Sequence, residues 1–377
     1  MKPTGSYDVI IIGGGIAGAS LASFLADQGI GDVLILERES QLAVHSTGRS
    51  AASISAFDGN DVVLDLKILG SRFWRKPPTG LFADAPLNPL GVLSLFAAEG
   101  FAALEERETE LRARGLEFEL LSAAACREKM PVLEAAGLAG GLFIGHDGRL
   151  DVHGILQGYL RHARAAGAEL VLGAEVSGIL REGPRVVGVR LPRGDVRADL
   201  VVNAAGAWAG RIGAMAEASP IQFQPKRRTL FTFPGPPDTD FRDWPMVWSD
   251  PHDVYFLPEA GELMLSPMDQ VPMQPCDPSP DEETIAAAIE RLRELAPSLV
   301  PRTIRSRWSG LRTFAPDDAH VIGTDPQRPG FFWLAGQGGA GIETSPAYAR
   351  IGAELIASGS TSCFDAARLA PERFAKG

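Results

Sequence analysis

The chain of 377 residues is long enough for two interleaved domains, and its 45% hydrophobic and 22% charged residues are typical of globular proteins. The formal net charge of -11 leaves no basic face for phosphate backbones, which excludes a non-specific nucleic-acid binder. The three cysteines are odd in number and lack C-x-x-C spacing, so we expect no metal site and a reducing, cytoplasmic location.

The amino terminus predicts a strand, a tight turn, a helix and a second strand over residues 7–12, 13–15, 16–28 and 33–37. The apolar stretch 9–26 resembles a signal peptide, but three glycines interrupt it and one lysine is its only basic flank. We therefore expect a βαβ unit rather than a leader. No other stretch is long and apolar enough to predict a transmembrane segment.

The remaining chain predicts alternating helices and strands, a long loop over residues 38–60, and a mostly β segment over 219–280. Helices are expected over 62–74, 101–114, 152–163 with Asp151 as N-cap, 281–295 behind a Ser279–Glu282 capping box, and 344–358. Strands are expected over 93–96, 142–144, 169–176, 186–191, 200–203, 222–233, 254–258, 262–267 and 331–335.

The first motif with chemical meaning is Gly13-Gly14-Gly15-Ile16-Ala17-Gly18, between the first predicted strand and helix. Gly13 permits the tight turn, Gly15 lets the backbone approach a pyrophosphate, and Gly18 lets helix and sheet pack closely. Glu37 ends the next strand, where it can accept hydrogen bonds from ribose hydroxyls and disfavours a 2′-phosphate. The pattern predicts dinucleotide binding; the alternative is that the glycines only shape a turn.

Two further segments favour FAD over NAD. Residues 45–52 (HSTGRSAA) place hydroxyls, a cation and small residues just after the ribose-binding strand, and a solvated polar loop is the alternative. The glycine-rich run 336–341 precedes a helix whose N-terminus could stabilise the negative charge of a reduced flavin.

These segments together resemble the D-amino-acid oxidase superfamily of FAD-dependent oxidoreductases, and within it D-arginine dehydrogenases. The resemblance covers residues 7–355 and rests on the fingerprint with Glu37-Arg38, HSTGRSAA, VVNAAGAW (201–208), QPKRR (224–228), WSGLR (308–312) and FFWLAGQGGAGIETS (331–345). It implies an α/β Rossmann-like FAD-binding domain of the glutathione-reductase type (1–78, 141–218, 310–377). It also implies an α+β substrate domain with a mixed or antiparallel sheet (79–140, 219–309).

The resemblance implies roles for individual residues. Arg312 falls on the carboxylate-binding arginine, Tyr255 on a substrate-contacting tyrosine, and Arg228, Gly339 and Glu343 on further substrate-side positions. For Arg312 the alternative is a structural ion pair, and for Tyr255 a core aromatic residue. The cofactor contacts are expected from Gly13, Gly15, Ile16, Ala17, Gly18, Glu37, Arg38, Ser46, Thr47, Gly48, Arg49, Ser50, Ala51, Ala52, Val176, Ala205, Gly206, Trp208, Gly310, Gly336, Gly338, Gly339, Ala340, Gly341, Ile342, Glu343 and Thr344.

The implied reaction is oxidation of a D-amino acid to an imino acid, which water hydrolyses to a 2-oxo acid and ammonia. FAD is expected to be bound non-covalently, because Cys363 lies too far past the glycine run to attach it. The electron acceptor is expected to be oxygen or a quinone-like compound.

Departures from the family pattern bear on the substrate. The acid that binds a guanidinium in D-arginine dehydrogenases falls at Val92, and a loop glutamine falls at Glu343. Loss of the acid predicts a preference for neutral or apolar side chains over basic ones, unless Asp58 or Glu343 restores a cation site. Alternatives are oxidation of glycine, an N-methyl or cyclic amino acid or a 2-hydroxy acid, and, in another class, a flavin-binding subunit without amino-acid oxidation of its own.

Overall fold

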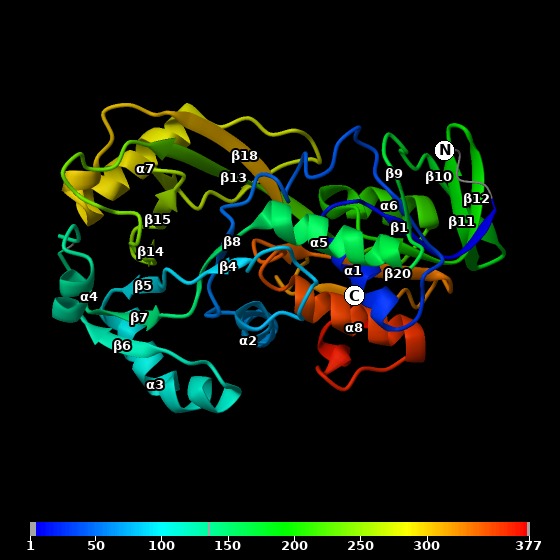
Figure 1. Cartoon of the computed structure of the whole chain (residues 1–377), viewed down its shortest axis with the longest axis horizontal. Coiled ribbons are helices and arrows are strands. Elements are labelled where there is room, and N and C mark those ends of the chain that lie inside the picture. The colour runs from blue at the N-terminus through cyan, green and yellow to red at the C-terminus, as the bar shows by residue number, and fades with distance from the viewer. Residues whose placement is uncertain (1–4, 135, 375–377) are drawn as a thin grey trace.

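The protein, described here as a computed structural model over residues 5–134 and 136–374, is built around two large β-sheets. In Figure 1 the first sheet and helices α1, α5 and α8 occupy the right half, and the second sheet with α3, α4 and α7 the left half. The predicted combination of a Rossmann-like unit with a mixed-sheet unit is confirmed.

Five neighbouring parallel strands form the centre of the first sheet. In spatial order they are β9 (Glu169–Val171), β2 (Val33–Leu36), β1 (Ser6–Ile12), β12 (Gly194–Asn203) and β20 (Phe331–Ala335). The antiparallel strands β11 (Arg185–Leu191), β10 (Gly178–Glu182) and β19 (Val321–Thr324) extend it. The central strands are runs of Val, Ile and Leu because helices cover both faces of the sheet.

One face of the first sheet packs against α1 (Ile16–Asp27), α5 (Val152–Ala165) and α8 (Ser345–Ser358), with α2 (Asp61–Arg75) against α8. The other face packs against α6 (Ala209–Ala216), which follows the short helix η1 (Gly206–Trp208). The predicted N-cap of α5 is confirmed, since Asp151 accepts a hydrogen bond of 2.9 Å from the backbone N–H of Gly154.

The second sheet has ten strands. In spatial order they are β21 (Gln337–Gly338), β18 (Ser306–Phe314), β13 (Gln224–Phe233), β16 (Glu262–Ser266), β15 (Val254–Glu259), β14 (Met246–Ser249), β5 (Val92–Phe96), β7 (Gly140–Ile144) and β6 (Glu119–Ser122), with β17 (Val271–Pro272) beside β13. Among the strands that the structure describes in this sheet, only β5 and β14 pair in parallel. Strands β3 (Ser53–Ile54), β8 (Gly148–Leu150) and β4 (Leu87–Asn88) form a small third sheet.

The outer face of the second sheet packs against α4 (Ala123–Lys129) and α7 (Glu282–Leu295), while α3 (Ala98–Arg114) packs near β5 and β7. The described part of the chain also contains four 3₁₀ turns: η1, η2 (Pro297–Leu299), η3 (Ala366–Arg368) and η4 (Pro371–Phe374). The inner face of this sheet is directed towards the nucleotide-binding half, because Ala51 of the HSTGRSAA loop packs on it.

Some local predictions need correction. Helix α7 is capped by Asp281, which accepts from Thr284 N–H at 2.9 Å, and not by Ser279, because the helix begins at Glu282 and Asp281 is the residue directly before it. The strand expected over 169–176 ends at Val171. Strand β7 and all of β18 belong to the second sheet, so residues 141–144 and 310–314 lie there; the limits of the two domains stay a prediction.

Candidate functional site

The turn between β1 and α1 has the geometry that a pyrophosphate needs. Gly13 has φ +115°, and a Cβ there would lie 2.3 Å from the carbonyl oxygen of Ala204. At Gly18 a Cβ would lie 2.0 Å from the carbonyl oxygen of Gly13, so this glycine serves close packing. Helix α1 begins after Gly15 without a side-chain cap, which leaves its N-terminus available to an anion.

Glu37 stands at the end of β2, as predicted, and braces this turn. Its Oε2 accepts a hydrogen bond of 2.9 Å from Gly14 N–H, and its Oε1 accepts one of 2.9 Å from Glu39 N–H. Each carboxylate oxygen has a second lone pair, so both remain able to accept a hydrogen bond from a ribose hydroxyl.

The HSTGRSAA loop lies across the N-terminus of α1. Thr47 Oγ1 accepts a hydrogen bond of 3.1 Å from Ile16 N–H, and Ser46 Oγ donates one of 2.7 Å to the carbonyl oxygen of Leu311. The guanidinium of Arg49 donates instead to Asp277 and to the carbonyl oxygen of Ser309, away from the turn. The loop therefore ties the first sheet to strand β18 of the second.

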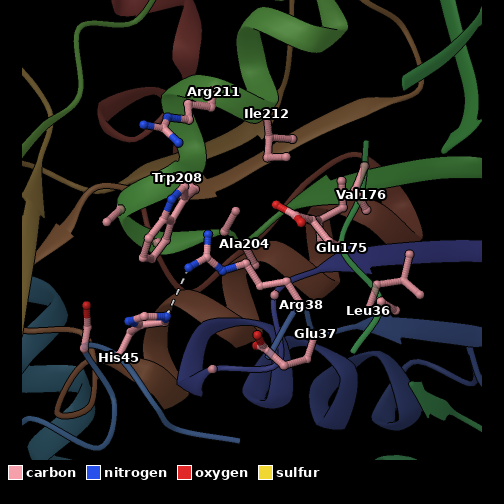
Figure 2. Close-up of a pocket in the computed structure, with 18 of the residues that line it drawn as sticks. Leu36, Glu37, Arg38, His45, Glu175, Val176, Ala204, Trp208, Arg211 and Ile212 are labelled. Carbon is pink, nitrogen blue, oxygen red and sulfur yellow. Dashed lines mark hydrogen bonds between the residues drawn. The ribbon is translucent and has the colours of Figure 1, made fainter. Parts of the chain in front are cut away.

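A hollow of about 200 Å³ opens beside the fingerprint, between β1, β2, η1 and α6. Predicted cofactor residues that line it are Gly13, Gly15, Glu37, Arg38, Ser46, Thr47, Val176, Ala205, Gly206 and Trp208. Figure 2 shows Arg38 extending to the Trp208 ring, with its Cζ 3.7 Å from the ring centroid, and His45 beside both. Arg211 and Ile212 of α6 close the opposite side.

A second hollow, of about 100 Å³, continues from the first, since Gly15, Ser46, Thr47, Ala204 and Gly206 line both. Its other walls include the predicted residues Ile16, Ala17, Ser50, Gly338, Gly339, Gly341, Ile342 and Arg312. We call the two hollows together the trough. A Cβ at Gly206 or Gly339 would meet no atom within 4 Å, so the trough has room where an elongated dinucleotide would lie, and the residues present fit FAD.

Several predicted cofactor residues do not line the trough. Gly48 is a packing position, since a Cβ there would lie 2.0 Å from the carbonyl oxygen of Ala43. Arg49 and Gly310 line a small adjoining hollow. The remaining ones line neither hollow: Gly18, Ala51, Ala52, Gly336, Ala340, Glu343 and Thr344.

The inner face of the second sheet brings the predicted substrate residues together. Arg228 lies directly opposite Gly310, and Arg312 follows two residues later on the same strand, so both arginines share one face. Arg312 is 8% exposed; its Nη2 donates 2.9 Å to the carbonyl oxygen of Arg49. Within the described residues neither arginine forms an ion pair with a carboxylate. Burial lowers the pKa of Arg312 to about 10, still well above neutrality.

Tyr255 lies on the same face in an apolar setting. Its ring stacks on Trp248 with centroids 5.4 Å apart, and its hydroxyl has no hydrogen-bond partner in the part of the chain that is described. The neighbouring wall consists of apolar side chains, which are Val92, Leu230, Met246, Leu257 and Met264. Val92, at the position of the family's acid, is fully buried.

Glu343 is directed away from this face, towards Lys67 of α2. Lys67 Nζ lies 3.2 Å from Glu343 Oε1 and 2.9 Å from Asp58 Oδ2. Burial raises the pKa of Glu343 to about 7, although the charge of Lys67 opposes the shift. The expectation that Asp58 or Glu343 offers a free site for a substrate cation is therefore wrong, because Lys67 already occupies both carboxylates.

The sequence analysis did not predict some residues of the trough and of the inner face of the second sheet. Arg211, Ile212 and Met215 line the trough because α6 directly follows η1, which carries Trp208. Trp248 and Met264 join the inner face through strand pairing. The apolar runs 246–248 and 263–265 were the available signal, but a continuous run does not say which side chains face the trough.

A dinucleotide trough beside a second sheet, with a buried arginine that has no carboxylate partner among the described residues, is typical of a flavin-dependent oxidoreductase. Residues 8–355 match the family described as DAO, FAD dependent oxidoreductase. The chain belongs to this family and uses FAD.

Known relatives cover the whole length of the chain. Sarcosine oxidase subunit beta of Rhizobium meliloti is 27% identical over 100% of this chain and 90% of its own length. Glycine oxidase of Bacillus subtilis is 25% identical over 93% of both chains. The crystal structure of L-proline dehydrogenase from P. horikoshii superimposes with a TM-score of 0.87 at 24% identity, over 99% of this chain and 98% of that one, which supports the fold.

No helix among the described residues combines the length and apolar character needed to cross a membrane. The cytoplasmic location and non-covalent attachment of FAD stay predictions.

Proposed function

We propose that the protein oxidises the C–N bond of a small amino acid. The observation that carries the proposal is Arg312, a buried guanidinium on the wall of the trough, with no carboxylate partner among the described residues. Bound FAD would supply the two-electron oxidant. The substrate would lose a hydride from its α-carbon and a proton from its nitrogen, and water would hydrolyse the resulting imino acid to a 2-oxo acid and ammonia.

The protein's own groups would orient the substrate. Two backbone carbonyls, of Arg49 and Leu311, fix the guanidinium of Arg312, which leaves its other N–H groups to grip a carboxylate. The hydroxyl of Tyr255 would accept from the amine or donate to the carboxylate. Such positioning supplies much of the rate enhancement, because hydride transfer needs a close, aligned approach. We assign no side chain as an obligatory base.

A D-configured substrate is proposed from the resemblance of the six motifs. The relatives favour a second candidate, an achiral amino acid, because the names of two of them refer to sarcosine and glycine. In either case a basic side chain is disfavoured, since Val92 offers no charge to a substrate cation and Lys67 already pairs with Asp58 and Glu343. This part of the proposal fails if D-arginine or D-lysine shows the highest kcat/KM.

Anaerobic mixing of the holoenzyme with D-amino acids, glycine, sarcosine and L-proline tests the proposal. Bleaching of the flavin absorbance is expected with at least one of them. Arg312→Met should lower kcat/KM at least a hundredfold, because a bidentate charged contact is worth about 3 kcal/mol. Arg307→Met is the matched control, since Arg307 is exposed on the same strand and pairs with Glu282. No bleaching with any compound would favour a flavin-binding subunit.

The electron acceptor is proposed to be oxygen or a quinone-like compound. Peroxide release measured alongside dye reduction distinguishes the two.

A further inference from the structure

Arg228 and Arg312 lie on the same face of neighbouring strands, and the side chain of Arg312 is turned towards the position opposite Arg228. A Cβ at Gly310, directly opposite Arg228, would lie 2.9 Å from Arg312 Nη1, so the side chain of Arg312 folds back over the glycine. Directly opposed residues of an antiparallel pair have Cβ positions about 5 Å apart. Because residue 310 has no side chain, the two guanidiniums can face one space.

Among the described residues neither guanidinium forms an ion pair with a carboxylate, and the nearby charge of Asp269, which opposes the burial that lowers the pKa of Arg312, is already paired with Arg227. Arg228 is 8% exposed, and its only described contact is from Nε to the carbonyl oxygen of Asp269, at 3.1 Å. The carboxylate of Asp269 pairs with Arg227 at 2.9 Å and accepts from Thr229 N–H. After burial, which is the main cause, the positive charge of Arg228 also lowers the pKa of Arg312. Both Nη groups of Arg228 therefore remain available to a ligand.

A substrate with one carboxylate would neutralise only one of these buried charges. The adjoining wall of Val92, Leu230, Met246, Leu257 and Met264 contributes no acid. Buried charges are stable in proteins when they are paired, so the second guanidinium calls for a second anion on the ligand.

We propose that the substrate is a short dicarboxylate, an amino or imino acid whose α-carboxylate binds Arg312 and whose second carboxylate binds Arg228. The inference rests on the proposed function and narrows the non-basic class of substrates to anionic ones. D-aspartate, D-glutamate and iminodiacetate have this chemistry; D-alanine, glycine and sarcosine are their counterparts without the second charge.

Binding of inert acids tests the inference without oxidation. Succinate and butyrate have the same chain length and differ in one carboxylate, and each is titrated into the holoenzyme while the flavin absorbance is followed. We expect succinate to bind at least tenfold more tightly than butyrate. In Arg228→Met the ratio should fall to about one, while the Kd of butyrate changes less than threefold. Such a loss corresponds to about 1.4 kcal/mol.

Lys226→Met is the matched control. Lys226 lies on the same face, directly opposite Arg312, but its Nζ contacts Gln270 Oε1 at 3.2 Å and lies 4.4 Å from the centroid of the Phe314 ring. Its removal lowers the local charge by the same amount and should leave the ratio unchanged. Arg228→Gln replaces Arg228→Met if the latter does not fold.

Two results overturn the inference. One is a wild-type ratio of the two affinities below about two. The other is an equal loss of affinity for succinate and for butyrate in Arg228→Met, which would mean that both guanidiniums hold one carboxylate. Kinetics separate this failure from that of the proposed function. If glycine or D-alanine reduces the flavin while the ratio is near one, only the inference fails. If succinate binds as expected but no amino acid reduces the flavin, only the proposed oxidation fails.

Discussion

Lys67→Met should destabilise the protein, because Lys67 neutralises the carboxylates of Asp58 and Glu343. The ammonium contacts Asp58, Glu343 and the carbonyl oxygen of Phe57 at 2.9, 3.2 and 3.3 Å. Burial lowers the pKa of Lys67, but the two carboxylates outweigh this effect and raise it, so the lysine is charged at neutral pH. Methionine would leave the buried carboxylate of Glu343 and the half-buried carboxylate of Asp58 without a cation, which costs about 3 kcal/mol of unfolding free energy.

The loss should depend on pH. The pKa of Glu343 is about 7 beside Lys67, and it rises further in the variant because the ammonium that lowers it is gone. At about pH 5.5 the residue is therefore protonated and can share its proton with Asp58, whereas at about pH 8 the folded variant must either take up a proton or leave both carboxylates charged, and each of these costs stability. We therefore expect the full loss at the higher pH and about half at the lower. Urea unfolding of the apoprotein at both pH values measures it.

Two variants serve as controls. Lys76→Met removes an exposed lysine at the end of the same helix and should cost less than about 0.5 kcal/mol. Lys67→Met combined with Glu343→Gln should recover most of the loss at about pH 8, because one of the two unpaired charges is removed. A loss below about 1 kcal/mol, or one of equal size at both pH values, would refute the reasoning.

Three further outcomes are expected. Gly339→Val should weaken FAD binding at least tenfold without changing the stability of the apoprotein, because a side chain there would enter open space in the trough. Gly210→Val, also at an open position, is the control, and flavin fluorescence titration measures the affinity of both variants for FAD. Asp281→Ala should destabilise the protein by about 1 kcal/mol and Ser279→Ala by much less, a comparison by urea unfolding that would contradict the assigned cap of α7 if reversed. Folded Glu343 holds its proton up to about pH 7 and the unfolded residue only to about pH 4.5, so the native state binds more protons in this window and the unfolding free energy falls by about 3 kcal/mol as pH rises through it; Glu343→Gln should remove that slope in the apoprotein.

The nucleotide-binding half could be predicted from the sequence because its signals are local. Gly13 and Gly18 lie where a Cβ would collide with the backbone, and Glu37 accepts a hydrogen bond from Gly14 N–H, all within one βαβ unit. The spacing of the glycines in the sequence therefore predicts this turn directly. The amphipathic pattern behind Asp151 likewise fixed α5 within two residues of its observed end.

The substrate side could be predicted only in part. Arg228 and Arg312 were found through motifs, but their shared face depends on the register between β13 and β18, which no local pattern specifies. The partner of Glu343 was missed for a similar reason: Lys67 lies 276 positions earlier in the chain, on a helix whose exposed and buried faces both contain charged residues.

Helix α2 explains why the motifs alone do not fix the geometry of the trough. Three positions on one face of α2 meet the segment that follows the glycine run: Lys67 pairs with the Glu343 carboxylate, Gly70 admits the Glu343 carbonyl where a Cβ would lie 2.2 Å from it, and Trp74 Nε1 donates 2.8 Å to that same carbonyl. The backbone N–H of Ser55 donates to the other oxygen of the carboxylate, at 2.9 Å. Glu343 therefore connects two loops, the one that contains Ser55 and the one that follows the glycine run, to helix α2. A chain with all six motifs but other residues at positions 67, 70 and 74 of α2 would hold the same glycine run less rigidly.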